Sequence, residues 1–265
     1  MSFLRTTAIL FTAQMRRILY SKRALLCLLV AMVPISVATL VRLVSEREGP
    51  PPEIFLLVMI WLVLVQASIP MIALIVGSAA VAEEVEDRTI TYLLTRPIPR
   101  GAILIGRWLA GLVVVLCLSL ASCYLTFKIA EDLGAVEEKY PPLPADILNR
   151  LLVVAALASL TYSAVFAAIG TFLKHPVIAG LAYTSVIEVF LANLPGGNQA
   201  MTIQYYLKSY LLAETPELAK AYQEHFNFLD LATPSDALSH LLTITAVALI
   251  FGVWRLSRRQ FLLPS

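Results

Sequence analysis

The chain has few charged residues for its length, and this scarcity limits the class of protein it can be. Only 14% of its 265 residues are Asp, Glu, Lys or Arg, whereas 59% are hydrophobic. A typical soluble domain is about a quarter charged and about half apolar. A soluble globule of this composition would expose large apolar patches and aggregate, and disorder requires low hydrophobicity. The composition therefore excludes both and indicates a membrane protein.

Residues that build disulfide and metal sites are equally scarce. The three cysteines, Cys27, Cys117 and Cys123, all lie within apolar runs, so no disulfide framework is visible. The three histidines form neither a zinc-spaced cluster nor an H-E-x-x-H motif. We therefore expect no metal site in this chain.

Motifs of enzymes that act on esters or nucleotides are missing. The chain has no G-x-S-x-G sequence. No lysine follows a glycine, so the phosphate-binding G-x-x-x-x-G-K-[ST] motif is absent as well. We predict a protein that is not an enzyme, has no catalytic residues and binds no cofactor of its own. The mild pI of about 8.4 indicates no nucleic-acid partner.

Apolar runs are what the sequence has in abundance. A helix needs about 20 mostly apolar residues to cross the hydrocarbon core of a bilayer. Several of the runs exceed about 25 residues, so the helices are expected to tilt. We predict an all-α, polytopic membrane protein with a single domain over residues 1–265. Six segments reach the required length or nearly do, namely residues 24–41, 54–82, 102–127, 147–173, 176–194 and 237–254.

The distribution of basic residues predicts the orientation of these spans. An even number of spans places both termini on one side of the membrane. The flanks on that side carry most of the 20 Lys and Arg residues. Because basic residues are enriched in cytoplasmic flanks, both termini are predicted to be cytoplasmic.

Residues 4–20 precede the first span and predict a helix that lies on the membrane surface. Arginines are interspersed with an apolar stripe at helical spacing, which is typical of an interfacial helix. A solvated segment with accidental periodicity is the alternative. A cleaved signal peptide is disfavoured because the apolar run that follows is longer than the usual 7–15 residues. The stripe consists of Leu4, Ala8, Phe11, Met15 and Ile18.

The loop after the second span, EEVEDRTITYLLTRPIPRGAILIGR at residues 83–107, has an ordered charge pattern. Acidic residues open it, arginines close it, and Pro97 and Pro99 interrupt it. Acids at the start of a helix and cations at its end complement the helix dipole. The pattern predicts a short cytoplasmic helix. Docking of a partner and a solvated loop that only sets the topology both fit this pattern.

Two features of the opposite side are candidates for function. The largest loop, residues 195–236, opens with a P-G-G-N turn and contains two predicted helices, at about 200–213 and 216–229. It could be a lid, a partner-binding cap or a passive cover. Glu188 lies in the outer half of the fifth predicted span, and an ionisable residue there is a functional candidate by default. It could line a transport pathway or act as a structural cap.

The stretch GSAAVAEEVEDRTITYLLTRPIPRGAILIGRWLAGL, residues 77–112, resembles the signature of type-2 ABC exporter permeases. That signature has a glycine that closes the second span, a following glutamate, and G-T-L-x-x-L-L-T-x-P and R-x-x-I-L-x-G-K elements. Asp87 and Arg88 replace the usual glycine, Ile90 replaces a leucine, and Arg107 replaces the lysine. The most similar subgroup is the short six-span permeases of nitrous-oxide-reductase maturation and gliding. The matching residues are Gly77, Glu84, Thr89, Leu93, Leu94, Thr95, Pro97, Arg100, Ile103 and Gly106.

The resemblance implies the permease subunit of an ABC exporter in the bacterial inner membrane. Two permease subunits, alike or different, would pair in the bilayer. Each would dock a separate cytoplasmic ATPase subunit that holds ATP and Mg. An ion-coupled secondary transporter, or an assembly factor that acts through residues 195–236, is the alternative. The residues that the resemblance implies for ATPase coupling are Glu83, Glu84, Glu86, Asp87, Arg88, Thr89, Leu93, Thr95, Arg96, Pro97 and Arg100.

Overall fold

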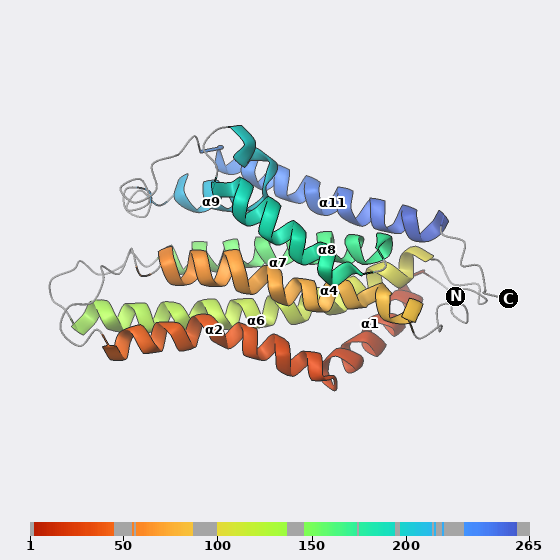
Figure 1. The fold of residues 1–265 in the computed structure, drawn as a ribbon, viewed down its shortest axis with the longest axis horizontal. Helices are drawn as coiled ribbons and strands as arrows, with labels where there is room; N and C mark the ends of the chain where they lie inside the picture. Colours follow the sequence, from red (N-terminus) through yellow and green to blue (C-terminus); the bar gives the residue numbers. More distant parts are fainter. Residues whose placement is uncertain are drawn as a thin grey trace.

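The part of the chain that the structure describes is an elongated bundle of helices with no β-strand (Figure 1). The prediction of an all-α, polytopic fold is confirmed. The start of α1 and the last turn of α11 lie at one end of the bundle, here called the terminal end, and α9 lies toward the other, here called the far end (Figure 1). The computed structural model describes residues 3–44, 55, 57–86, 100–136, 146–173, 175–193, 197–213, 215, 219 and 231–258.

Within the described ranges, five helices are long and apolar enough to cross a membrane. They coincide with the predicted spans at 24–41, 54–82, 102–127, 147–173 and 237–254. The second of them is continuous but changes from π-helical to α-helical spacing between η1 and α4. The helices are α2 (Lys22–Val44), η1 (Leu57–Ser68) with α4 (Ile69–Glu86), α6 (Arg100–Val136), α7 (Asp146–Phe172) and α11 (Pro234–Arg258).

The remaining predicted span, 176–194, is a shorter and irregular helix. The apolar helix Pro176–Phe190 is shorter than the five long spans and is not one of them. It starts near the terminal end and leads to α9 at the far end (Figure 1). Three consecutive segments make it up, namely α8 (Pro176–Ala182), the π-helix η2 (Tyr183–Phe190) and the 3₁₀ turn η3 (Leu191–Asn193).

The loops at the far end contain more helix than predicted in one place. The helix α6 continues to Val136, so the start of the loop expected after residue 127 is helical. An exposed ion pair, Lys128 Nζ to Glu131 Oε2 at 2.6 Å, lies on this extension. The predicted helix at 200–213 is present as the 3₁₀ turn η4 (Gly197–Met201) and α9 (Ile203–Ala213). The predicted helix at 216–229 lies outside the described residues.

The N-terminal helix α1 (Phe3–Leu19) covers almost all of the predicted surface helix. Its buried residues are Thr6, Gln14 and Ile18, of which only Ile18 belongs to the predicted apolar stripe, whereas Leu4 of that stripe is 79% exposed. The helix rests its more polar face on the neighbouring α6 and leaves Leu4 on the outer surface. That arrangement fits a helix whose apolar residues meet lipid, and its interfacial position stays a prediction.

The two prolines within spans do not end their helices. Pro34 lies inside α2, and Pro70 is the second residue of α4. A proline removes a backbone donor, and a carbonyl left over within a bilayer needs a partner from the protein. In the turn before Pro34, the carbonyl oxygen of Ala31 accepts a hydrogen bond from Ser122 Oγ at 2.8 Å. The carbonyl that Pro34 leaves without a helical donor is that of Val30, four residues earlier. The bond from Ser122 is therefore an additional contact between α6 and α2 in the same turn.

Glycines allow the closest helix contacts. A Cβ atom on Gly77 would lie 3.0 Å from Cβ of Phe166, so the backbones of α4 and α7 approach closely there. A Cβ atom on Gly106 would lie 2.8 Å from the carbonyl oxygen of Thr7, which brings α1 directly onto α6. Small residues at such contacts are typical of membrane helix packing, where backbones meet without large side chains between them.

We expect Gly106→Ala to destabilise the protein because the new methyl group meets a backbone oxygen that cannot rotate away. Overpacking of this kind costs about 1–3 kcal/mol, or roughly 3–10 °C in melting temperature. Thermal unfolding of the detergent-solubilised chain measures it. Gly101→Ala is the matched control, because its nearest contact is the movable Cγ1 of Val253 at 3.3 Å. Equal melting temperatures for the two variants would contradict the packing described.

Candidate functional site

The predicted ATPase-coupling segment lies largely outside the described residues. Glu83, Glu84 and Glu86 are in the last turns of α4, and Arg100 begins α6. The end of α4 and the start of α6 both lie at the terminal end (Figure 1). The segment between them therefore connects two spans at that end. The residues outside the described ranges are Asp87, Arg88, Thr89, Leu93, Thr95, Arg96 and Pro97.

Glu188 is the most deeply buried acidic residue for which the structure describes a side chain, with an exposed fraction of 0%. It lies in η2, and two tyrosine hydroxyls donate hydrogen bonds to its carboxylate. Tyr162 on α7 donates to Oε2 at 2.9 Å, and Tyr183 on η2 donates to Oε1 at 2.6 Å. A buried carboxylate costs much free energy unless such donors replace water. The two tyrosines supply part of that replacement.

The rest comes from the backbone at the start of α9. The N–H of Ile203 donates to Glu188 Oε1 at 3.2 Å, and the N–H of Gln204 donates to Oε2 at 3.1 Å. The next N–H, of Tyr205, donates to Thr202 Oγ1 at 3.1 Å. The first N–H groups of a helix have no partner within the helix. Glu188 and Thr202 satisfy three of them, and a negative charge is favourable at that end of the helix dipole.

The side chain of Gln204 links this cluster to the second span. Its Nε2 donates to the hydroxyl of Tyr162 at 2.9 Å and to the carbonyl oxygen of Val65 at 3.3 Å. Val65 lies five residues before Pro70, which is the spacing of a π-helical hydrogen bond. Proline has no N–H to donate. Gln204 therefore supplies a donor to a carbonyl whose own helix cannot provide one.

The cluster of Glu188, Tyr162, Tyr183 and Gln204, here called the Glu188 cluster, joins four elements: η1, α7, η2 and α9. Both π-helical segments take part, since η1 contributes Val65 and η2 contributes Glu188. π-Helical turns are rare and occur frequently at functional sites. The geometry resembles that of a helix cap and favours the structural interpretation of Glu188. A role in lining a pathway stays a prediction.

A buried cation follows one turn later on α9. Lys208 is 9% exposed, and its Nζ lies 5.9 Å from the centre of the Trp61 ring. Burial lowers the pKa of Lys208 to about 8. The face of α9 that packs against the spans therefore contains polar and basic side chains. The stability of this contact depends on the hydrogen bonds and ring contacts that these side chains make.

Only Glu188 of this cluster stands out in the sequence. It is an acid inside an apolar run, which is a clear signal. Tyr162, Tyr183 and Gln204 have no such signal, because none of them is a charged residue within an apolar run. The combination of Pro70 with a preceding apolar helix does predict an unsatisfied carbonyl, but not which donor reaches it. Among the residues that the structure describes, no group of three His, Cys, Asp or Glu side chains could hold a metal ion.

The fold and the Glu188 cluster define a polytopic helical membrane protein in which a buried polar cluster connects several helices. A family model described as "ABC-2 family transporter protein" matches residues 8–260. The chain therefore belongs to the ABC-2 transporter family, a family of transmembrane components. The comparison with curated proteins gave no match. The resemblance to the short six-span subgroup stays a prediction.

We expect Glu188→Gln to destabilise the protein, because the amide oxygen cannot accept all four hydrogen bonds. The amide NH₂ group would instead face two groups that now donate to the carboxylate. Hydrogen bonds to charged groups each contribute about 1.5–3 kcal/mol, so a total loss of about 2–4 kcal/mol is expected. Thermal unfolding in detergent should show a melting temperature lower by roughly 5–10 °C. Glu131→Gln is the control, since Glu131 is exposed at the end of α6.

The same pair of variants separates the two interpretations of Glu188. A structural cap predicts that Glu188→Gln lowers stability and that transport per folded molecule is preserved. A melting temperature equal to that of the control, together with a loss of transport, would instead place Glu188 in the pathway.

Proposed function

We propose that the chain is the permease subunit of an ABC exporter and that a separate cytoplasmic ATPase subunit drives it. The observation that carries the proposal is the match of the ABC-2 family to residues 8–260, which covers all of the described spans. The family normally works with an ATPase partner, and this sequence has no phosphate-binding motif of its own. In this proposal ATP and Mg are held by the partner.

The proposed contact with the ATPase is the segment from Glu83 to Arg100. It connects the end of α4 to the start of α6, so a displacement of this segment by the ATPase would act on both helices. The helix α4 is packed within the bundle, with Ile69 and Ile72 fully buried and Gly77 against α7. Packed helices transmit displacement as small rigid shifts. A motion of the ATPase could thereby reach the helices that surround the Glu188 cluster.

The proposed orientation places the terminal end in the cytoplasm of a bacterial cell, with the bundle in the inner membrane. The last turn of α11 carries Arg255 and Arg258 at that end, and Arg16 and Arg17 end α1 at its elbow with α2. Positive charge near the ends of spans favours the cytoplasmic side. The far end, with α9 and the Glu188 cluster, then lies outside the cytoplasm.

A second permease subunit would use the spans at the edge of the bundle. In the apolar stretch of α2 and in that of α11 only 22% is buried, compared with 61% for α7 and 67% for the span that starts at Val58. Exposed apolar faces of this kind meet either lipid or another subunit. We propose that one of these two helices forms the contact between paired permeases.

Charge reversal in the proposed coupling segment should disconnect the ATPase without unfolding the spans. The variant combines Glu83→Lys, Glu84→Lys and Arg88→Glu. Co-purification with the ATPase encoded beside this chain, and ATP hydrolysis by the complex, are the measurements. We expect at least a ten-fold loss of co-purified ATPase, because opposite charges across a docking surface become like charges.

The control reverses the exposed pair at the far end, with Lys128→Glu and Glu131→Lys, and should leave the complex intact. Failure of the unaltered chain to form a complex with that ATPase would refute the proposal. Substrate movement driven by an ion gradient without ATP would favour the secondary-transporter alternative.

A further inference from the structure

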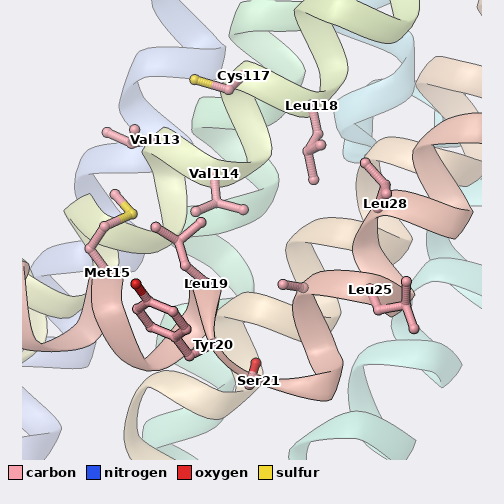
Figure 2. A pocket seen from close by; sticks show the side chains of 11 residues that line it. Met15, Leu19, Tyr20, Ser21, Leu25, Leu28, Val113, Val114, Cys117 and Leu118 are labelled. Carbon is pink, nitrogen blue, oxygen red and sulfur yellow. The ribbon is translucent and has the colours of Figure 1, made fainter.

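An open apolar groove lies at the elbow between α1 and α2 (Figure 2). Its volume is about 570 Å³. Side chains from three helices surround it, among them Met15 and Leu19 from α1, Leu28 from α2, and Val113 and Cys117 from α6. The volume is within the range of roughly 300–1,000 Å³ that is usual for small-molecule sites.

The elbow that shapes the groove is a tight turn with its own hydrogen bonds. The N–H of Tyr20 donates to the carbonyl oxygen of Arg16 at 3.1 Å, and Ser21 Oγ donates to that of Ile18 at 2.8 Å. The N–H of Ala24 in turn donates to the carbonyl oxygen of Ser21 at 3.1 Å. Because these bonds fix the angle between α1 and α2, the groove is preformed and no rearrangement is needed to fill it.

The groove opens toward the surface that the spans present to lipid. Leu25 and Leu28 on its wall are 61% and 48% exposed, and Val113 on the opposite wall is 41% exposed. These side chains belong to helices that cross the bilayer. The occupant that reaches the groove most directly is therefore a hydrocarbon chain from the surrounding membrane.

The elbow is also strongly basic. Arg16 and Arg17 end α1, Lys22 and Arg23 begin α2, and all four side chains are exposed. The sequence contains no Asp or Glu before Glu46, so the charges that α1 and α2 themselves carry are all basic. Basic residues beside a membrane attract acidic lipids, and each contributes roughly a factor of five in binding.

We propose that this groove is a binding site for an acidic phospholipid, with one acyl chain in the groove and the phosphate near Arg16 and Lys22. The proposal rests on the cytoplasmic orientation of the terminal end given above, where acidic lipids of the inner leaflet would be available. It names a lipid that stays bound at the elbow, in addition to the transported substrate.

A second permease subunit is the competing occupant, and the charges disfavour it. A pair related by a twofold axis makes contact through the same patch on both subunits. Contact through the elbow would bring the cations of one subunit toward the same cations of the other, and such like-charge contacts are unfavourable. An acidic lipid has the opposite charge and the required apolar chain.

Native mass spectrometry of the full chain in detergent tests the proposal with two probes that have identical acyl chains, phosphatidylglycerol and phosphatidylcholine. We expect tighter binding of phosphatidylglycerol. Arg16→Gln combined with Lys22→Gln should weaken that binding roughly ten- to thirty-fold, from the contribution of two cations. The control, Arg5→Gln with Arg42→Gln, also removes two cations and should retain nearly full binding.

A second variant tests the groove itself. Val113→Trp places a large side chain on the groove wall and should reduce phosphatidylglycerol binding at least five-fold. Val247→Trp is the control, since Val247 is 58% exposed on α11 and does not line the groove. Melting temperatures confirm that each variant is folded.

Three results would overturn the proposal. The first is equal binding of the two lipids. The second is unchanged phosphatidylglycerol binding both in the Arg16→Gln, Lys22→Gln variant and in Val113→Trp. The third is a loss of paired permease in Val113→Trp with lipid binding intact. The lipid measurement uses no ATPase, so its failure is distinguishable from failure of ATPase docking.

Discussion

A carboxylate buried between helices must find its hydrogen-bond donors within the protein, and much of this structure is arranged around that requirement. Glu188 receives two tyrosine hydroxyls and two backbone N–H groups, and Gln204 extends the cluster to the second span. Within a bilayer no water replaces a missing donor. The same constraint explains why a π-helical span with Pro70 is tolerated, because a side chain from α9 satisfies its carbonyl.

The cluster gives the far end of the bundle a fixed relation to the spans. The helix α9 has 11 residues, a length that is marginal in isolation, and it is held both by this cluster and by buried apolar side chains such as Leu207 and Leu211. Glu188 connects it to α7 and η2, and α7 packs against α4 at Gly77. In the proposed function α4 also leads to the ATPase contact. A continuous set of packed helices therefore joins the two ends, although coupling between them requires its own measurement.

The spans could be predicted from sequence because a bilayer demands about 20 apolar residues in a row. The extension of α6 to Val136 could not, since it is polar and carries the pair Lys128–Glu131. Glu188 was predictable as a candidate, but its partner Tyr162 is 26 residues earlier and Gln204 is 16 residues later. Such separations have no sequence pattern. The apolar stripe of α1 predicted the helix correctly. It could not predict that Gly106 brings the backbone of Thr7 onto α6, because that contact depends on a glycine about 100 residues away.

Hydrogen–deuterium exchange across residues 197–213 tests most directly whether Glu188 holds the start of α9. In the unaltered chain the amides of Ile203 and Gln204 should be protected. In Glu188→Gln they should exchange at least ten-fold faster, whereas amides in the middle of α7 should be unchanged. Equal protection of Ile203 and Gln204 in both proteins would contradict the role given to Glu188.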